Sequence, residues 1–587
     1  MISELTVQFL VSVTSRWQIG CGLMTKSGNK ELCVHRTSRV WPLMAIIFTS
    51  LAANHAVADT ESEEVSAHVL QAEIALQRQE YKTAASEYRK AAELSGNVDI
   101  AKQATRIAFS YGFNEDALRS AKRWAKLDED GDEALLYIAQ LQLRLGDIKA
   151  SRRSLNRLLK DGEQPPDERL VSLIPFLSQE DPEDANELMQ QLARPYKNSA
   201  SAQYAAGVMA LQAGDSDEAT DRATRALELK PDWLKAQLLK ARAMLLGGDQ
   251  EGAIDYTSRI VGDDPDPDPE ARMELAIMLL SAGRDDDALS QVNQILLEQP
   301  NRADALRLMA IINFRLENLD AAWADFQDLL SSGQYTMDAL YYLGRISDRR
   351  SEHEQAVRLY SQVQRGNNAV ISQRRASAIL AQQGKDDEAL ELLRQFGADN
   401  PIYAVDMVEA EAQLLTSLDL YPEALEAYER VIEFRPDSEP AVLGKAELLL
   451  RMGRLDDALS EYRQSVKRWP DSAMSLNALG YTLADRTEEY AEAEKLIKKA
   501  LKLDPDSAAI IDSYGWVLYR LGENERALEE LQRAYTILND AEVASHIVEV
   551  LGSLERLEEA LKVLEEAELV NPDSEILRNI RERVFPE

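Results

Sequence analysis

The chain has 587 residues, of which 45% are hydrophobic, 28% charged and 6% aromatic. This hydrophobic content can fill a buried core, but large sheet-based cores use more aromatic and β-branched residues. Acidic residues outnumber basic residues by 101 to 66, so the net charge is −35. This charge argues against nucleic acid and anionic membranes as general ligands, because both require a basic surface.

Residues 1–58 have the layout of a secretory leader. Basic residues are followed by the short apolar run 41–53, and Ala56-Val57-Ala58 comes after it. A basic region, an apolar region and small residues at a cleavage site are typical of a secretory signal. We expect cleavage after Ala58, translation from Met24, and a short acidic segment over residues 59–65.

Asn54 stands where a lipoprotein signal has its acylated cysteine. Without that thiol there is nothing to acylate, so we expect an exported periplasmic protein, with outer-membrane association as the alternative. Both cysteines, Cys21 and Cys33, lie in the expected leader. After its removal, thiolate chemistry and disulfides are excluded.

Few residues remain from which to build a catalytic or metal site. Beyond the leader the histidines are His68, His353 and His546, which are far apart in sequence. There is no HExxH motif, and no glycine-rich phosphate loop follows a strand. We therefore predict no enzyme activity, no metal and no cofactor.

An alanine recurs along the chain with a mean spacing of 34 residues, and every gap is 33, 34 or 35 residues. The fifteen positions are Ala84, Ala117, Ala150, Ala185, Ala219, Ala253, Ala288, Ala322, Ala356, Ala389, Ala424, Ala458, Ala493, Ala527 and Ala560. Such a period indicates a repeat architecture. We call this series the alanine ladder.

Other residues keep a constant offset from the ladder. Proline recurs twelve residues after it, tyrosine four residues after it, and glycine twelve residues before it. Small residues let two antiparallel helices approach closely, and proline ends the second helix of each pair. Glycines such as Gly214 and Gly453 suit the turn between the helices. Pro165, Pro166 and Pro175 are expected to interrupt this pattern.

This pattern resembles the tetratricopeptide repeat, a helix-turn-helix unit of 34 residues. The resemblance covers nearly all of residues 66–572, and a capping helix is expected within residues 573–587. It implies an all-α, right-handed superhelical α-solenoid of about fifteen repeats, in which each repeat contacts its neighbours.

Residues Leu476–Thr487 and Asp512–Gly522 resemble a more specific family. It consists of exported proteobacterial repeat proteins and includes an outer-membrane adaptor lipoprotein. That adaptor activates a periplasmic carboxyl-terminal processing protease and delivers cell-wall hydrolases to it. The chain differs from that adaptor lipoprotein in having Asn54 in place of the lipidated cysteine.

In such a superhelix the first helices line the concave face. Aromatic residues facing a groove are natural anchors for an extended peptide or a partner helix. The alternative is that some of them pack between repeats. Trp516 and Tyr519 are the preferred candidates. The predicted protein-binding residues are Tyr204, Arg307, Tyr341, Arg345, Asn477, Tyr481, Asp512, Trp516 and Tyr519.

Two other patterns give weaker hypotheses. Lys102 resembles the start of a clamp for a C-terminal carboxylate, but Arg106 and Leu136 stand where asparagines belong. Asp264, Asp266 and Asp268 alternate as in a calcium loop, and so do Asp128, Asp130 and Asp132. The first of these loops lacks the glycine and glutamate that an EF-hand requires. Solvated turns are favoured over calcium binding in both places.

The function predicted from these observations is a non-catalytic protein-binding scaffold or adaptor of the cell envelope. The family resemblance implies recruitment of a processing protease and its cell-wall hydrolase substrates. The alternative is a structural assembly factor for an envelope or secretion complex, without a protease partner. We predict no nucleic acid, no small-molecule substrate, and membrane association only through partners.

Overall fold

The computed structural model describes residues 60–586, apart from residues 79, 129–130, 161–163 and 264–265. The expected leader, with its cleavage site at Ala58 and Asn54, lies outside the described residues, and so do Asp130 and Asp264. The described residues form helices and turns and contain no strand, so the all-α prediction is confirmed for them. None of their helices is both long enough and apolar enough to cross a membrane.

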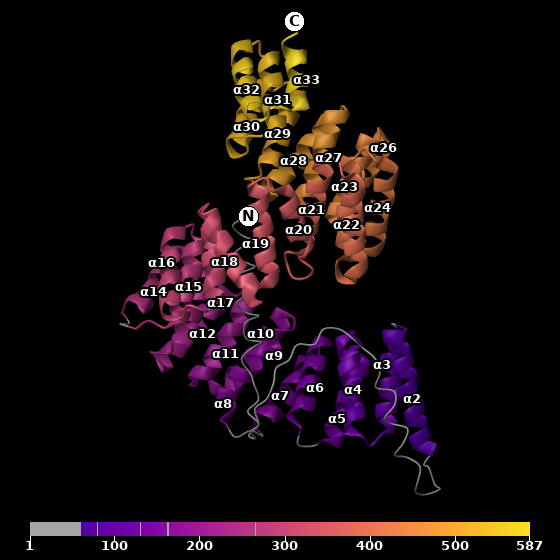
Figure 1. Ribbon diagram of the computed structural model, residues 1–587, viewed down its shortest axis with the longest axis vertical. Helices are drawn as coiled ribbons and strands as arrows, with labels where there is room; N and C mark the ends of the chain where they lie inside the picture. Colours follow the sequence, from indigo (N-terminus) through magenta and orange to yellow (C-terminus); the bar gives the residue numbers. More distant parts are fainter. Residues whose placement is uncertain (1–59, 79, 129–130, 161–163, 264–265, 587) are drawn as a thin grey trace. The chain divides into compact units, whose positions relative to one another are not determined.

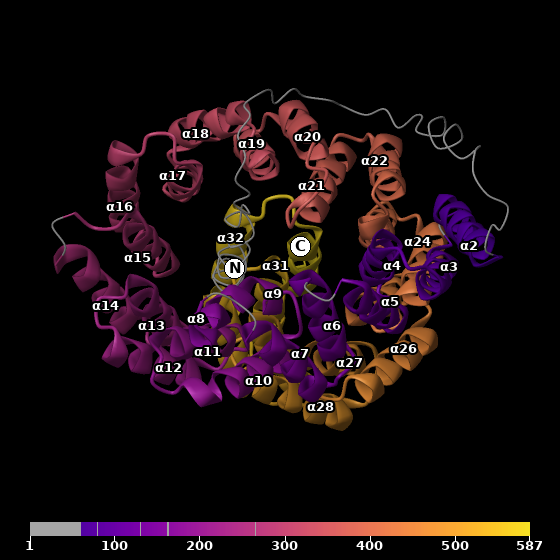
Figure 2. The same cartoon turned by 90° about the horizontal axis from the view of Figure 1, so that it is seen from below.

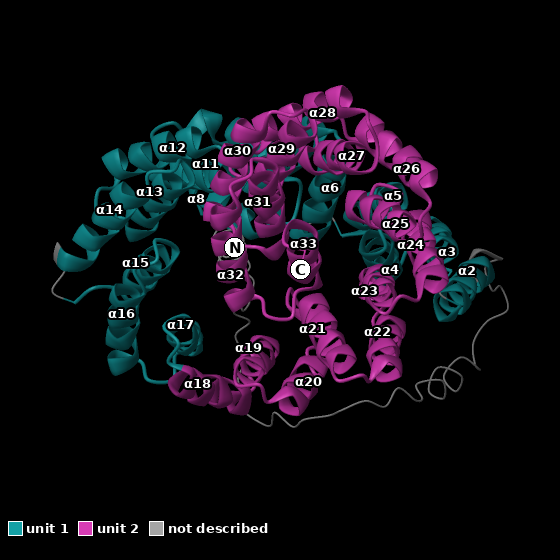
Figure 3. Cartoon of the chain, turned by 90° about the horizontal axis from the view of Figure 1, so that it is seen from above, with its two compact units in different colours: residues 1–318 teal, residues 319–587 magenta. Residues whose placement is uncertain are grey.

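The chain divides into two compact units, residues 1–318 and residues 319–587 (Figure 3). In the first unit the helices alternate between first and second members of antiparallel pairs (Figure 1). They are α2 (Thr60–Gln77), α3 (Tyr81–Leu94), α4 (Val98–Ser110), α5 (Asn114–Leu127), α6 (Asp132–Arg144), α7 (Ile148–Lys160), α8 (Pro166–Arg169), η2 (Leu170–Leu173), α9 (Ile174–Leu177), α10 (Pro182–Ala193), η3 (Arg194–Tyr196), α11 (Ala200–Gln212), α12 (Ser216–Leu229), α13 (Leu234–Leu246), α14 (Gln250–Asp263), α15 (Pro269–Ser281), α16 (Asp285–Glu298) and α17 (Ala303–Arg315).

The second unit repeats the arrangement, and each helix packs against the next along the chain. Its helices are α18 (Leu319–Ser332), α19 (Thr336–Arg349), α20 (His353–Ser361), α21 (Ala369–Gln382), α22 (Asp386–Asp399), η4 (Pro401–Tyr403), α23 (Ala404–Ser417), α24 (Tyr421–Phe434), α25 (Glu439–Arg451), α26 (Leu455–Arg468), α27 (Ala473–Arg486), α28 (Tyr490–Leu503), α29 (Ala508–Arg520), α30 (Asn524–Ile537), α31 (Ala541–Ser553), α32 (Leu557–Val570) and α33 (Glu575–Val584).

Every alanine of the ladder lies on the second helix of a pair and is buried, with an exposed fraction of at most 7%. The glycines opposite it have no room for a side chain. A Cβ atom on Gly515 would lie 2.6 Å from Leu531 Cγ and 3.2 Å from the carbonyl oxygen of Ala527. Real Cβ atoms do not approach other atoms so closely, so these small residues set the distance between the paired helices.

Turns and breaks follow the residues that the sequence places there. Gly214 and Gly453 have φ of 79° and 72°, the left-handed conformation that glycine adopts without a steric penalty. The prolines at 165, 166 and 175 replace one first helix with α8, η2 and α9. Leu170, Leu173 and Leu177 remain buried there, so the interrupted segment still covers the core.

The last helix, α33, covers the end of the second unit. Ser574 caps it by accepting a hydrogen bond from the backbone N–H of Leu577 at 3.4 Å. Leu577 and Ile580 are buried, and Arg581 pairs with Glu568 through contacts of 2.8 and 2.5 Å. The helix therefore shields apolar surface that the final pair would otherwise expose.

Within each unit, the first helices of the pairs lie on one side and the second helices lie on the other side. In the first unit, Figure 2 shows α12, α14 and α16 outside α11, α13 and α15. Side chains that point away from the second helices therefore form a surface on the first helices. In the second unit, α27, α29 and α31 are consecutive first helices that contact one another.

Candidate protein-binding surface

The structure brings four of the nine predicted residues together, at the C-terminal end of the second unit. Tyr481 lies on α27, and Asp512, Trp516 and Tyr519 lie on α29. His546 of α31 joins them, although its role was not predicted from the sequence. Asp512 and His546 are 34 residues apart, so they occupy equivalent positions in successive repeats and lie side by side.

His546 is the centre of this arrangement. Its Nδ1 donates a hydrogen bond to Oδ1 of Asp512 at 2.9 Å. Its ring stacks on Trp516, with centroids 4.2 Å apart and planes inclined by 24°. The Tyr481 ring lies 6.2 Å from the imidazole, and the Tyr519 ring lies 5.2 Å from the indole. These contacts gather the rings of Tyr481, Trp516, Tyr519 and His546 into one cluster.

Carboxylates from α31 border the rings. The Tyr481 hydroxyl donates to Oε1 of Glu542 at 3.1 Å, and Glu549 pairs with Arg583 of α33 at 3.0 Å. We call the side chains of Tyr481, Asp512, Trp516, Tyr519, Glu542, His546 and Glu549 the C-terminal aromatic surface.

Charge and burial act in opposite directions on His546. Burial alone lowers the pKa of its imidazole, but the hydrogen bond to Asp512 and the nearby charges of Asp512, Glu542 and Glu549 raise it. The net effect is a pKa above the ordinary value for histidine. Burial also raises the pKa of Tyr481, and the carboxylate of Glu542 raises it further. Tyr481 is therefore a neutral hydrogen-bond donor at neutral pH.

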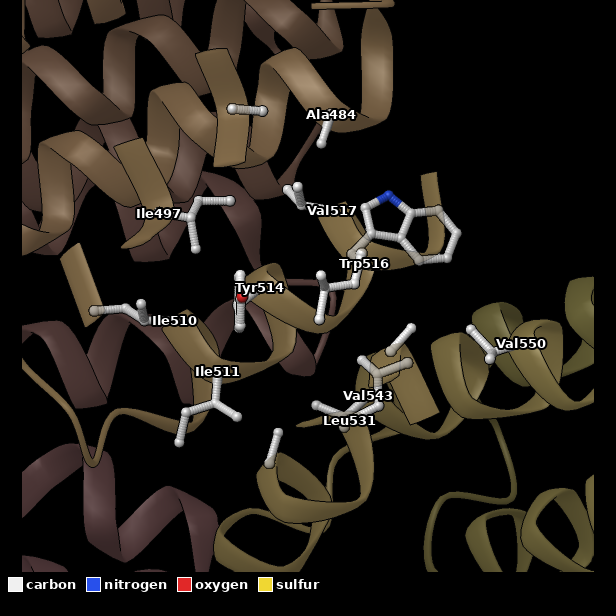
Figure 4. Close-up of a cluster of buried hydrophobic side chains, with 14 of the residues drawn as sticks. Ala484, Ile497, Ile510, Ile511, Tyr514, Trp516, Val517, Leu531, Val543 and Val550 are labelled. Atoms are coloured by element: carbon white, nitrogen blue, oxygen red, sulfur yellow. The ribbon is translucent and has the colours of Figure 1, made fainter. Parts of the chain in front are cut away.

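Only part of this surface is accessible. Trp516 is 5% exposed, although the sequence suggested that its ring faces a groove. Figure 4 shows its indole apart from the side chains of Ile497, Ile510 and Tyr514. The indole N–H has no hydrogen-bond acceptor among the described residues. Tyr481 and Tyr519 are half-buried and Glu542 is exposed, so a partner can reach these side chains, whereas the half-buried Glu549 is paired with Arg583.

The other predicted residues do not join this surface. Asn477 lies on α27 one turn before Tyr481, and its buried Oδ1 has no partner among the described residues. Tyr341 and Arg345 form a separate pair on α19, with the guanidinium carbon 5.6 Å from the ring centroid. Arg307 lies on α17 of the first unit and is partly exposed.

Tyr204 lies in the core of the first unit. It is 5% exposed, and its ring is 4.8 Å from that of Trp233, at an angle of 45°. Burial raises the pKa of its hydroxyl. Tyr204 therefore packs inside the repeat array, as the alternative for the predicted aromatic residues expected, and its ring is not presented to a partner.

The side chains considered for metal or carboxylate binding have structural partners. Asp268 caps α15 by accepting from the backbone N–H of Glu270 at 2.8 Å, and Asp128 accepts from the Trp124 indole at 3.2 Å. Arg106 pairs with Glu133 at 2.8 Å. Within the described part of the chain, no group of three or more His, Cys, Asp or Glu residues could hold a metal ion.

Comparisons with known proteins agree with the repeat architecture. Models described as tetratricopeptide repeat match residues 133–161, 176–232, 210–268, 244–312, 443–508 and 484–542. The TPR repeat-containing protein PA4667 of Pseudomonas aeruginosa is 28% identical over 529 residues, which cover 89% of this chain and 88% of that protein.

Two further relatives match over shorter stretches. Cellulose synthase 2 operon protein C of Komagataeibacter xylinus is 27% identical over 405 residues, which cover 64% of this chain and 28% of that protein. Lipopolysaccharide assembly protein B of Escherichia coli K12 is 24% identical over 268 residues, which cover 43% of this chain and 59% of that protein.

Proposed function

Because the chain is a tetratricopeptide repeat protein, we propose that it is a non-catalytic protein-binding scaffold of the cell envelope. We propose further that one partner binds the C-terminal aromatic surface through Tyr481, Tyr519 and Glu542. Aromatic side chains on a rigid helical layer provide contact area at a low cost in conformational entropy.

One observation carries this proposal: the accessible aromatic side chains rest on a buried, hydrogen-bonded cluster. Tyr519 contacts Trp516, Trp516 stacks on His546, and His546 is held by Asp512. A binding site needs such support, because loosely held side chains lose entropy when a partner orders them. Half-exposed tyrosines without buried partners would not have this advantage.

The charge of the surface indicates the chemistry of the partner segment. Glu542 is exposed and its carboxylate lies beside Tyr481, whereas the carboxylate of Glu549 is already paired with Arg583. Carboxylates beside aromatic rings favour a cationic side chain, which the ring faces attract as well. We therefore propose an extended or helical partner segment that carries at least one lysine or arginine.

The sharper form of the proposal concerns a protease adaptor. The segment that resembles the exported adaptor family includes Tyr481, Asp512, Trp516 and Tyr519, which are four of the residues of this surface. By analogy, the partners would be a periplasmic carboxyl-terminal processing protease and its cell-wall hydrolase substrates. The sequence of residues 1–58 supports export to the periplasm, which N-terminal sequencing and fractionation of the native protein would test.

Reconstitution with purified components tests the adaptor proposal. The chain should raise the rate at which the processing protease of its own organism cleaves a hydrolase, and should cleave nothing alone. The rate should pass through a maximum and fall as more chain is added, because excess scaffold separates the two partners. No stimulation and no binding to the protease would contradict the adaptor proposal.

Two matched variants test the surface itself. Tyr519→Ala with Glu542→Gln changes the C-terminal aromatic surface, whereas Tyr535→Ala with Glu529→Gln makes the same changes on the second helix α30. Tyr519 and Tyr535 are both half-buried, and Glu529 and Glu542 are both exposed. Only the first pair of substitutions should weaken partner binding. Equal weakening by both pairs would contradict a site on the first helices.

A structural assembly factor is the second candidate. The similarity to a lipopolysaccharide assembly protein supports it, because the name of that relative assigns it to assembly and not to proteolysis. Cross-linking of the native envelope followed by mass spectrometry separates the two proposals. Cross-links to a processing protease favour the adaptor, and cross-links confined to components of an envelope complex favour the assembly factor.

A further inference from the structure

A pocket on the second helices of the first unit has more basic than acidic residues in its lining, although the chain as a whole is acidic. This pocket of about 680 Å³ opens between α10 with η3 and α12. Its lining includes Arg194, Lys197, Arg222 and Arg225, together with amide side chains and Glu187. Four cations gathered in one pocket are unexpected in a chain with a net charge of −35.

The connection between α10 and α11 supplies two of the four cations, Arg194 and Lys197. Twelve residues after Ala185 the sequence has Lys197 and not the proline found in many other repeats. The 3-10 turn Arg194–Tyr196 extends α10 before α11 begins at Ala200. This longer connection places Arg194 and Lys197 opposite the arginines of α12.

The base of the pocket is fixed by a buried amide. Gln203 of α11 is 3% exposed, and its Oε1 accepts from Nη1 of Arg222 at 2.8 Å. Its Nε2 donates to the carbonyl oxygen of Lys197 at 3.0 Å. Gln203 therefore holds the Arg222 guanidinium and the backbone of Lys197 in a defined relation to each other.

Among the described residues, two of the four basic side chains form ion pairs with glutamates, and the other two do not. Arg222 Nε donates to Glu218 at 2.8 Å, and Arg225 Nη1 donates to Glu228 at 2.5 Å. Arg194 and Lys197 are exposed and form no ion pair with any residue that the structure describes. Glu187 is the acidic residue in the lining, so the lining contains more basic than acidic side chains.

We propose that this basic pocket binds a small polyanion, a ligand that carries two or more phosphate or carboxylate groups. Arginine guanidinium groups match both oxyanions by paired N–H donors, and lysine adds a mobile point charge. The volume of the pocket lies within the range of about 300–1,000 Å³ usual for small-molecule sites and exceeds the needs of one phosphate ion. The site is independent of the proposed scaffold function, and it departs from the sequence-based expectation that the ligands are proteins and not small molecules.

Calorimetric titration of the full chain with inorganic pyrophosphate and with citrate tests the proposal. At least one probe should bind with a stoichiometry of one, and binding should weaken as salt is raised. Saturation by pyrophosphate alone identifies a phosphate ligand, and saturation by citrate alone identifies a carboxylate ligand. Saturation by both indicates recognition of the shared charge. The absence of saturable binding by either probe would overturn the proposal.

A matched pair of variants locates the site. Arg194→Gln with Lys197→Gln should weaken binding by about tenfold or more, because charge-assisted contacts are lost. Arg119→Gln with Lys122→Gln removes the same two charges from exposed positions on α5 and should leave binding unchanged. All four side chains are exposed, so both variants should keep the melting temperature of the parent. Equal weakening in both variants would show that net charge, and not the pocket, governs binding.

Discussion

The imidazole of His546 stacks on the indole of Trp516, with 4.2 Å between ring centroids and 24° between ring planes. The two residues belong to adjacent first helices, α31 and α29. Asp512 accepts a hydrogen bond from Nδ1 of the imidazole. The stack therefore joins two repeats through one histidine, and it supports the aromatic side chains that we propose as the binding surface.

The first prediction concerns pH. The folded state raises the pKa of His546 above the unfolded value of about 6.5. The stability that protonated His546 contributes is therefore fully present below about pH 6.5 and is lost as the pH rises through the folded pKa. Hydrogen exchange of α29 and α31 should show greater protection at about pH 6 than at about pH 9.

The variant His546→Gln is the control for this prediction. Glutamine keeps a donor for Asp512 but does not titrate. The dependence of protection on pH between these two values should therefore decrease in the variant. An unchanged dependence would assign the effect to other groups.

The second prediction concerns Trp516. Because this side chain is 5% exposed, Trp516→Ala removes core packing and should destabilise the second unit by about 3–5 kcal/mol. Chemical unfolding of the purified chain measures the change. A loss below about 1 kcal/mol would mean that the ring is mobile and exposed in solution. For this reason Tyr519, and not Trp516, is the residue to change when binding is tested.

The third prediction concerns the alanine ladder. Ala527 is fully buried where α30 crosses α29, so Ala527→Leu should cost about 1–3 kcal/mol by overpacking. Each repeat contacts its neighbours, so the damage should centre on residues 507–571. Hydrogen exchange resolves the location. Uniform loss of protection along the whole chain would contradict a solenoid.

The fourth prediction concerns an ion pair between the first helices α13 and α15. Arg242 donates to both oxygens of Glu274 at 2.8 and 2.5 Å, and the Glu274 side chain is 10% exposed. Arg242→Met leaves that carboxylate buried without its partner and should destabilise the first unit by about 3–5 kcal/mol.

The double variant Arg242→Met with Glu274→Leu tests the cause. Removing the carboxylate as well removes the unpaired charge, so most of the lost stability should return. If the double variant is as unstable as the single variant, packing by the arginine stem is the main contribution.

The repeat architecture could be predicted because it rests on residues that act locally. Small residues at Ala527 and Gly515 permit close helix crossing, and proline and glycine end helices by their own backbone geometry. The degree of burial of Trp516 could not be predicted, since it depends on a ring from the next repeat. The sequence did contain a signal for that contact: His546 follows Asp512 by one repeat length, which places the two side by side.

The basic pocket was not predicted for a similar reason. Arg194 and Lys197 are close to each other in sequence, but Arg222 and Arg225 come from the following repeat. The fold brings the four cations around the buried amide of Gln203, with two of them in the connection after α10. The net charge of the whole chain gives no sign of such a site, because the acidic residues elsewhere outnumber the basic residues.

We propose that the first-helix surface of α27, α29 and α31 binds a protein partner. Site-specific photo-cross-linking in the native envelope tests it most directly, with the photoreactive residue at position 519 and a control at position 535 of α30. If this surface binds a partner, a discrete protein adduct should form at position 519 and should be absent at position 535. No adduct at position 519, or the same adduct at both positions, would contradict it.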